Sequence, residues 1–428
     1  MKLIQLKDRA PSLNMDCESD RRVMLFDLSI RGHHPNYIQC LIQYWYKQKF
    51  SNRLDIVVLP KFIEEHSDVV SLATNNQKGT VRFLAITPEE EARLSSRKSS
   101  INRTARAFQE WQLLCHYARY LQATHCLIMY FDTFQLPLVL GFPSPCSLSG
   151  IYFRPTFHYS IFTNYRLTWK DQIQQWRERF MLFRVLRHSH LETLFCLDPF
   201  AVEYLNQFHP KVKVAYLPDP VKLNFSSEAQ VSHLREKLEI QPGRQVFLLF
   251  GALTQRKGIQ QLLTAISMLP PTVSQKLCLL LVGETRATEK ALIDAQTEKI
   301  CTSQPVQMIH VCEFVPDQDI PAYFQLADVV LATYQRHVGM SGILLLAAAA
   351  QKPVLSSDYG LMGELVRRYE LGLTVDSTVP DEIAQGITRF MLEPPERLGD
   401  RTKMKAFAEQ NSAERYAHVI SQYVLSDC

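Results

Sequence analysis

Two glycine-containing segments in the last third of the chain carry residue types that suit a diphosphate. The first begins at Gly251, after an apolar run, and includes Arg256, Lys257 and Gly258. The second precedes an apolar helical pattern and comprises Gly339, Met340, Ser341 and Gly342. A glycine turn between a strand and a helix directs backbone N–H groups and the positive end of the helix dipole toward an anion. With two cations beside them, these segments predict a site for a nucleotide-linked substrate.

The first half of the chain offers candidates at the ends of predicted strands. Asp132 is placed either to orient a sugar or accept a proton from an acceptor hydroxyl, or to start a turn with its side chain. Arg154 and His158 follow the next predicted strand and could bind an anionic acceptor or a phosphate. An exposed loop histidine is the alternative interpretation of His158. Asp198, before Pro199, predicts only a helix N-cap.

Apolar runs alternate with helical patterns through the whole sequence, which predicts an α/β fold with parallel sheets covered on both faces. At 428 residues, two domains are expected. We predict two doubly wound, Rossmann-like domains facing across a cleft at the carboxyl ends of their strands. The expected ranges are 1–217 for the first domain and 218–405 for the second, with 406–428 as a C-terminal helical segment. Leu217-Pro218-Asp219-Pro220 is the expected hinge.

Composition and charge narrow the class of protein. The chain is 46% hydrophobic and 21% charged, which is typical of a soluble enzyme. Met1 to Asp20 lacks the apolar run of a signal peptide, no segment is long enough to span a bilayer, and the ten cysteines are scattered. These features favour a reduced, cytoplasmic setting. Met1 to Ala215 carries 27 Lys and Arg against 19 Asp and Glu, so the first half is the basic one.

Two alternatives stay open for the positive charge of the first half. The stretch with Arg93, Arg97, Lys98, Arg103 and Arg106 is either a solvated loop or a surface for an anionic acceptor or anionic lipid at the inner membrane face. The apolar stripe of the following helix, 105–123, is either core packing or a peripheral membrane contact. Nucleic acid is not expected as a partner, because no recognised motif or aromatic platform accompanies the modest net charge of +4.

The order and spacing of several segments resemble the family-4 glycosyltransferases of the GT-B fold, most closely from Thr193 to Ile387. Leu217 to Val221 resembles the family's hinge, and Phe250 to Gly258 its phosphate loop. Further matches are Leu281-Val282-Gly283, Ala327-Asp328-Val329, Lys352-Pro353-Val354, Gly363-Glu364-Leu365-Val366 and Gly372. In the first half, the resemblance is mainly the loop Gly32-His33-His34 and the strand-helix plan.

The resemblance implies transfer of a sugar from a nucleotide-sugar donor to a sugar or glycolipid acceptor, with retention of configuration, no metal and no cofactor. It also implies that the domain 1–217 binds the acceptor, that the domain 218–405 binds the nucleotide sugar, and that the helix in 406–428 packs back toward the first domain. Lys257, assisted by Arg256, would neutralise the diphosphate as the nucleoside leaves, a kind of stabilisation worth roughly 3 kcal/mol per group. The N–H groups of Gly339 to Gly342 would hold the distal phosphate and the donor sugar. Gly32, His33 and His34 would lie at the donor phosphate and the acceptor; a structural role is the alternative for both histidines.

One departure from the family bears on activity. The family carries two glutamates eight residues apart, and alignment on Lys352-Pro353-Val354 puts these positions at Val338 and Leu346. Neither side chain can hydrogen-bond a sugar hydroxyl. Two explanations stay open: a divergent subgroup that binds the nucleotide through Ser341 and glycine N–H groups, or a nucleotide-sugar-binding scaffold that has lost turnover.

Other enzyme classes fit less well. A sugar-nucleotide epimerase needs carboxylates and histidines in its second domain, where the loops offer only His337 and Glu284. No G-x-G-x-x-G follows the first strand, which disfavours a dehydrogenase, and no G-x-x-x-x-G-K-S/T is present, which excludes a P-loop ATPase.

Overall fold

The computed structural model describes residues 21–30, 32–74, 79–96, 99–162, 168–208, 210–221, 225–394 and 397–425. The chain divides into two compact units. The first unit holds the described residues up to Pro155, Arg179–Leu217 and the chain from Tyr416 onward; the second holds Thr156–Glu178 and Pro218–Arg415. The predictions about Met1 to Asp20, Arg97 and Lys98 lie outside the described residues.

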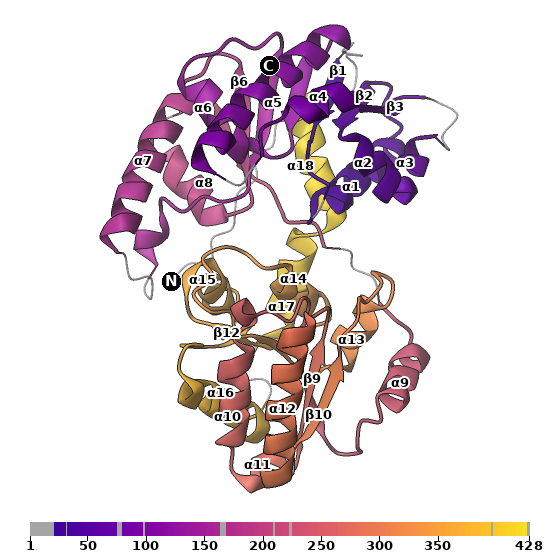
Figure 1. Cartoon of the computed structure of the whole chain (residues 1–428), viewed down its shortest axis with the longest axis vertical. Helices are drawn as coiled ribbons and strands as arrows, with labels where there is room; N and C mark the ends of the chain where they lie inside the picture. Colours follow the sequence, from indigo (N-terminus) through magenta and orange to yellow (C-terminus); the bar gives the residue numbers. More distant parts are fainter. Residues whose placement is uncertain are drawn as a thin grey trace. The chain divides into compact units, whose positions relative to one another are not determined.

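The first unit is a parallel sheet with helices between its strands (Figure 1). Among the described residues, seven strands lie in the order β3-β2-β1-β4-β5-β6-β7. The strands are β1 (Arg22–Phe26), β2 (Arg53–Val58), β3 (Val81–Ala85), β4 (His125–Ile128), β5 (Ser147–Tyr152), β6 (Leu191–Cys196) and β7 (Lys213–Tyr216). The helices are α1 (His34–Lys47), α2 (Pro60–Glu65), α3 (Ser67–Thr74), α4 (Pro88–Arg93), α5 (Ser100–Tyr120), α6 (Gln135–Val139), α8 (Pro199–Asn206) and α18 (Ala413–Leu425), with the 3₁₀ helix η1 (Phe131–Thr133). Helix α7 (Trp169–Val185) begins in the segment that groups with the second unit and ends in the first, and η2 (Tyr159–Ile161) precedes it.

The second unit repeats this plan with six described strands in the order β10-β9-β8-β11-β12-β13. The strands are β8 (Gln245–Phe250), β9 (Leu277–Val282), β10 (Gln307–Val311), β11 (Val329–Ala332), β12 (Val354–Ser357) and β13 (Gly372–Val375). The helices are α9 (Glu228–Lys237), η3 (Gln255–Lys257), α10 (Ile259–Ser267), α11 (Pro271–Ser274), α12 (Ala287–Ser303), α13 (Ile320–Leu326), α14 (Gly342–Ala349), α15 (Gly360–Arg368), α16 (Pro380–Leu392) and α17 (Arg401–Gln410).

The central strands are apolar throughout because helices cover both faces of each sheet. All six residues of β9 are buried. In β8, Phe247 and Leu249 belong to a core shared with α10, α12 and α16, while Phe250 contacts Tyr323 and Phe324 of α13 on the other face (Figure 1). The α/β plan predicted from the sequence is therefore confirmed, with two doubly wound, Rossmann-like units.

The strand order identifies where a ligand site is expected in each unit. Strand order reverses between β1 and β4 in the first sheet and between β8 and β11 in the second. In an open parallel sheet, the loops at the carboxyl ends of such a pair of strands diverge to opposite faces and leave room for a ligand. The predicted site residues at Lys257 and Gly339–Gly342 follow β8 and β11, and His34 and Asp132 follow β1 and β4.

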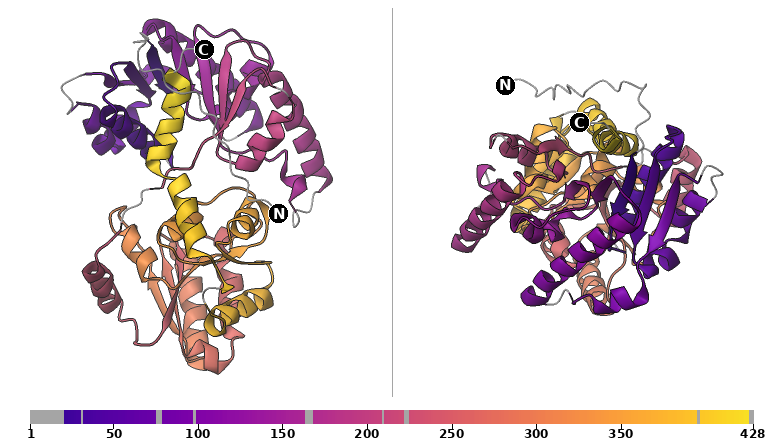
Figure 2. Two further views of the ribbon diagram at one scale, coloured as in Figure 1. Left: turned by 180° about the vertical axis from the view of Figure 1, so that it is seen from behind. Right: turned by 90° about the horizontal axis from the view of Figure 1, so that it is seen from above.

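Helix α18 lies against the first unit beside α1, as Figures 1 and 2 both show. The Tyr416 ring packs on Tyr37, and Nδ1 of His418 lies 2.8 Å from the hydroxyl of Tyr44. At the far end of the helix, Tyr423 contacts Phe195 of β6.

The apolar stripe of α5 is part of the core. Trp111, Leu114, Ala118 and Leu121 are all buried. The membrane interpretation of this helix is thus wrong, because the side chains that would enter a bilayer are the ones that pack beneath the helix. In the described part of the chain, no helix has both the length and the apolar character needed to cross a membrane.

Candidate functional site

In the second unit, a tight turn carries the chain from β8 into α10. The 3₁₀ helix η3 ends at Gly258, whose φ of 71° lies in the left-handed region. A Cβ atom at this position would lie 2.3 Å from the carbonyl oxygen of Thr333 and 2.4 Å from Nε2 of Gln335. Only glycine fits here, both for its backbone conformation and for the close approach of the loop after β11. The turn and that loop are therefore packed directly against each other.

A lysine beside a glycine turn is expected on an exposed loop, but this expectation is wrong for Lys257, which is buried with only 4% of its surface exposed. Its Nζ donates a hydrogen bond to the Phe250 carbonyl and lies 5.0 Å from the centre of the Tyr334 ring. Burial lowers the pKa of Lys257, and the neighbouring Tyr334 acts in the opposite direction. A Cβ on Gly251 would lie 3.1 Å from this Nζ, so the glycine leaves space for the ammonium. The cation is thus fixed at the carboxyl end of β8.

Tyr334 connects the two loops of the second unit. The centre of its buried ring lies 5.0 Å from Nζ of Lys257 and 5.5 Å from the guanidinium of the exposed Arg256. Its hydroxyl lies 2.8 Å from Oγ of Ser341, the residue that precedes α14. Tyr334 therefore places two cations and the start of α14 around one side chain.

Hydrogen bonds to backbone carbonyl groups hold the loops of the second unit together. Oγ1 of Thr333 donates to the Lys257 carbonyl at 2.9 Å, and the Gln335 N–H donates to the Arg256 carbonyl at 2.8 Å. The Gln335 amide donates to the carbonyl of Ser377, whose hydroxyl donates to the Tyr334 carbonyl. The loops after β8, β11 and β13 thus form one connected network.

The predicted phosphate segment Gly339, Met340, Ser341 and Gly342 leads directly into α14 and is partly exposed. The first N–H groups of a helix have no acceptor within the helix. Nε2 of His337 donates to the Met340 carbonyl at 3.3 Å, which turns the peptide chain just before the helix. This arrangement can bind an anion between the segment and the cations on η3.

Val338 and Leu346 are both partly exposed. The Val338 carbonyl accepts from the Leu361 N–H, and its backbone approaches Gly360 so closely that a Cβ there would lie 2.9 Å away. Leu346 lies on α14. Two partly exposed apolar side chains thus lie at the positions where the resemblance predicts carboxylates.

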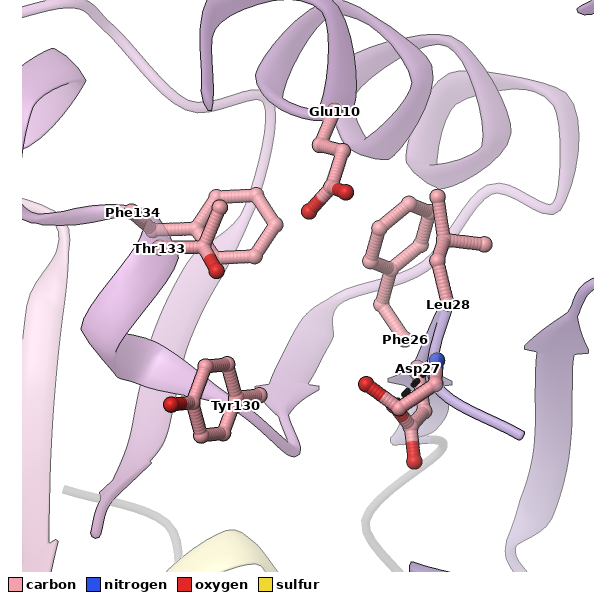
Figure 3. A pocket seen from close by; sticks show the side chains of 8 residues that line it. Phe26, Asp27, Leu28, Glu110, Tyr130, Thr133 and Phe134 are labelled. Atoms are coloured by element: carbon pink, nitrogen blue, oxygen red, sulfur yellow. Dashed lines mark hydrogen bonds between the residues drawn. The ribbon is translucent and has the colours of Figure 1, made fainter. Parts of the chain in front are cut away.

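In the first unit, a small hollow opens between the ends of β1 and β4 (Figure 3). Its volume is about 10 Å³, enough for a single water molecule. Glu110 enters it from α5, and Asp27 and Tyr130 line the other end (Figure 3). The Glu110 carboxylate accepts a hydrogen bond from Arg106 at 2.6 Å, so its charge is already compensated.

Asp27 and His34 form a hydrogen-bonded pair at this hollow. Nδ1 of His34 lies 2.7 Å from Oδ2 of Asp27, and Oδ1 of Asp27 accepts from the Ser29 N–H. The Asp27 side chain is fully buried and that of His34 is 12% exposed. Because a carboxylate oxygen accepts, Nδ1 carries the proton, and Nε2 is left as the nitrogen that can accept one. The His34 ring is held flat against Phe153 at 5.7 Å.

Asp132 lies on η1, and its Oδ2 accepts from the Phe153 N–H at 3.0 Å. Part of its surface is accessible, yet the dense protein around the carboxyl desolvates it. Desolvation raises the pKa of Asp132 to about 6, against the opposing effects of the Phe153 hydrogen bond and the Arg154 charge. A carboxyl group with this pKa changes protonation close to neutral pH.

The remaining first-half candidates fall in different environments. Gly32 and His33 are exposed in the turn before α1, and the His33 ring stacks on Tyr37. Arg154 is exposed after β5, and its positive charge acts to lower the pKa of Asp132. His158 is fully buried among the rings of Phe157, Tyr159 and Phe162, so neither the acceptor role nor the exposed-loop interpretation holds. Its ring is a packing element in the described structure.

Sequence reasoning missed Asp27, Tyr334, Gln335 and Ser377. Tyr334 follows closely on the predicted strand Val329 to Ala332, and its position at the switch point was a usable signal. Asp27 lies within the predicted strand Val23 to Leu28, but the strand β1 ends at Phe26, so Asp27 lies just past its carboxyl end. The side-chain amide of Gln335 donates to the Ser377 carbonyl across 42 residues of sequence, a contact for which the sequence carries no signal.

The second unit matches a known family. Residues 230–411 match the family model described as "Glycosyl transferases group 1", so this segment resembles enzyme domains of that group. A protein of Methanocaldococcus jannaschii described as an uncharacterized glycosyltransferase is 28% identical over 214 residues, which cover 48% of this chain and 50% of the relative. The chain thus spans about half the length of the curated relative it matches.

Solved structures match both units together. A glycosyltransferase from Rickettsia africae superposes with a TM-score of 0.65 at 11% identity, over 96% of this chain and 100% of the other. HepE of Anabaena in complex with UDP gives 0.64 at 15% identity, over 95% and 100%. Sucrose-phosphate synthase from Thermosynechococcus elongatus gives 0.64 at 15% identity, over 94% and 98%. At these identities the matches establish the fold, which is GT-B, with two Rossmann-like domains.

Proposed function

We propose that the protein is a glycosyltransferase that moves a sugar from a nucleotide-sugar donor to a sugar or glycolipid acceptor. The observation that carries this proposal is the network around Tyr334, which joins Lys257 and Arg256 to the start of α14 within the segment that matches group 1 glycosyltransferases. Cations and open helix N–H groups on either side of one switch point suit a diphosphate.

The donor would be bound in the second unit. Exposed Arg256 meets the diphosphate first, while buried Lys257 supplies a fixed positive charge. An ammonium has three N–H donors, and the Phe250 carbonyl takes one of them. A bound diphosphate would stabilise the charged form of Lys257, which burial disfavours. Charge fixed in advance in this way stabilises a leaving group without reorganisation during the reaction.

The donor nucleotide is proposed to be UDP-linked. The Anabaena HepE structures hold UDP and UDP-glucose, which makes UDP-sugars the first donors to test. With Val338 and Leu346 in place of carboxylates, the ribose and the sugar would be held by the hydroxyl of Ser341 and by loop N–H groups. Retention of configuration and independence of metal complete the proposal and rest on the family resemblance.

The acceptor would be activated in the first unit. In this proposal Nε2 of His34, oriented by Asp27, accepts a proton or hydrogen-bonds the acceptor hydroxyl, and Asp132 orients the donor sugar. Gly32 and His33 are exposed in the turn before His34, and Arg154 is exposed after β5; these residues would contact the acceptor or a phosphate.

Val338 and Leu346 favour a second candidate, a scaffold that binds nucleotide sugars without turnover. Each buried hydrogen bond lost to the ribose would cost about 1–3 kcal/mol. The active enzyme and the scaffold would both bind a nucleotide sugar, but only the enzyme would transfer the sugar. Binding and transfer measured on one protein preparation therefore separate the two candidates.

The test is a thermal-shift screen against UDP, GDP, ADP, CMP and their sugar conjugates, followed by an assay of nucleotide release with simple sugar and lipid-linked acceptors. A nucleotide at 100 times its Kd adds about 2.7 kcal/mol of stability. We expect one nucleotide class to stabilise the protein and to be released from its sugar. Stabilisation without release would favour the scaffold, and no stabilisation by any of them would contradict both candidates. NMR of the product anomer and an assay in EDTA test retention and metal independence.

A further inference from the structure

Helix α7 exposes a continuous apolar stripe. Successive members of the stripe are four or three residues apart, so they line one side of the helix. They are 43% to 70% exposed and comprise Trp169, Ile173, Trp176, Phe180 and Phe183. Monomeric proteins rarely expose a contiguous patch of large apolar side chains without a binding role.

The other side of α7 accounts for its packing. Gln175, Leu182 and Val185 are buried, and Arg179 stacks on Tyr204 of α8 at 5.3 Å. Figure 1 shows α7 (magenta) alongside α8. The helix is therefore fixed to the protein by one side, and its exposed stripe is additional apolar surface. This is the reverse of α5, where the apolar side is the buried one.

Charge is distributed unevenly around α7. Lys170, Arg177 and Arg184 are exposed beside the stripe. The two acids of the helix point elsewhere and are engaged locally: Asp171 accepts from the N–H and hydroxyl of Thr168, and Glu178 from those of Thr156. The exposed surface around the stripe is therefore basic.

We propose that α7 binds an anionic membrane surface, lying in the plane of the interface with its apolar stripe in the lipid. Trp and Phe on one side of a helix, flanked by Lys and Arg, form the pattern of interfacial helices. The long basic side chains can reach anionic headgroups while their methylenes stay on apolar surface. Lys170 already lies 5.6 Å from the Trp169 ring, and Arg187, just beyond the helix, lies 3.6 Å from Phe183.

The apolar surface extends beyond the carboxyl end of the helix. Nε2 of His188 donates to the Phe142 carbonyl at 3.1 Å, which holds the loop carrying the exposed Leu140 and Phe142 next to this end. A second apolar segment beside the stripe would deepen the membrane contact. The proposal does not depend on the catalytic proposal above.

Vesicle flotation tests this inference with the full-length protein. Vesicles of phosphatidylcholine with about 30% phosphatidylglycerol should bind the protein, and vesicles of phosphatidylcholine alone should bind at least tenfold less. Trp176→Ser with Phe180→Ser, and separately Arg177→Glu with Arg184→Glu, should each weaken binding to the anionic vesicles at least tenfold. The matched controls are Phe314→Ser and Lys299→Glu with Lys276→Glu, which change exposed residues of the second unit and should bind as wild type does.

Intrinsic tryptophan fluorescence measures membrane binding of the wild-type protein, so it does not depend on a variant that could fail to fold. Of the four tryptophans, Trp45 and Trp111 are buried, so a shift to shorter wavelength on adding anionic vesicles reports Trp169 and Trp176. Trp169→Phe with Trp176→Phe should abolish the shift. The inference is overturned if neither vesicle type binds, if the α7 variants bind as well as the controls, or if the α7 variants instead abolish a dimer in lipid-free buffer.

Discussion

In the second unit, backbone carbonyl groups position Lys257 and Thr333 at the switch point, whereas in the first unit a carboxylate and an aromatic ring position His34. Lys257 is positioned by the Phe250 carbonyl and Thr333 by the Lys257 carbonyl, with Gly258 allowing the loops to touch. His34 is positioned by the Asp27 carboxylate and the Phe153 ring. One strand order thus supports two kinds of site.

The difference agrees with the extent of the family match, which covers residues 230–411 in the second unit. Backbone contacts require glycines and strand ends at set positions, and such requirements persist in a recognisable motif. A side-chain contact such as that of Asp27 with His34 could be made by other pairs of residue types, so it leaves no fixed sequence motif. We therefore expect the second unit to determine donor binding and the first unit to determine chemistry on the acceptor.

The largest effect is expected from Lys257→Met, which removes the charge but keeps the volume. Because this charge is fixed beside the proposed diphosphate, transfer should fall about 100- to 1,000-fold. Steady-state rates at saturating donor measure the change. Lys276→Met, on an exposed lysine of the same unit, is the control and should retain full activity. An unchanged rate in Lys257→Met would remove Lys257 from the mechanism.

Gly258→Ala tests whether the loops of the second unit are fixed by close backbone contact. The left-handed conformation and the 2.3 Å approach to the Thr333 oxygen should together cost about 3 kcal/mol of unfolding free energy. Gly243→Ala is the matched control, since its φ of 76° is similar but no atom lies within 4 Å, and it should cost about 1 kcal/mol. Urea denaturation measures both, and equal costs would mean that the contact carries no energy.

In the first unit, His34→Ala should lower the transfer rate about 100-fold, and Asp27→Asn about tenfold, because Asp27 acts by orienting the ring. Neither variant should change the affinity for nucleotide, since both lie outside the second unit. Calorimetric titration with the nucleotide, run beside rate measurements, separates the two quantities. A loss of nucleotide affinity in His34→Ala would break the division of roles between the units.

The smallest effect concerns Asp132 and pH. With a pKa of about 6, its carboxylate is lost as the pH falls through 6, so transfer should decline about tenfold between pH 7 and pH 5. Asp132→Asn should lower the rate at pH 7 and flatten this decline. An identical pH profile in the variant would assign the decline to another group.

The same shift predicts the sign of a stability change. The folded chain holds the Asp132 proton more tightly than the unfolded chain, whose pKa is 3.8. This carboxyl therefore favours folding at low pH and loses that contribution as the pH rises from about 4 to 6. Asp132→Asn keeps an acceptor for the Phe153 N–H and should leave stability at pH 7 equal or higher. Unfolding of the variant would make Asp132 a structural residue.

Much of the fold could be predicted from the sequence because buried parallel strands are continuous apolar runs. The runs at β8, β9 and β11 gave the strand bounds that the structure has. Short or polar elements such as α2, α9 and β13 were not predicted, since their residues carry little periodicity. Asp198 is the N-cap of α8, as its position before Pro199 predicted.

The site was less predictable, because the environment of a side chain depends on which distant segments of the chain pack against it. Lys257 beside a glycine turn suggested exposure, but the turn directs it back under Tyr334, which lies 77 positions later. His158 is buried among Phe157, Tyr159 and Phe162, and this run of aromatic neighbours was a signal for burial. The pairing of Asp27 with His34 across a loop follows from no periodicity.

The most direct test of the central claim is calorimetric titration of UDP, GDP and ADP into wild type, Lys257→Met and His34→Ala. The account predicts that one nucleotide binds wild type and His34→Ala with equal affinity and binds Lys257→Met at least tenfold more weakly. Equal binding by Lys257→Met and wild type, or no binding of any nucleotide to wild type, would contradict a donor site at the β8–β11 switch point.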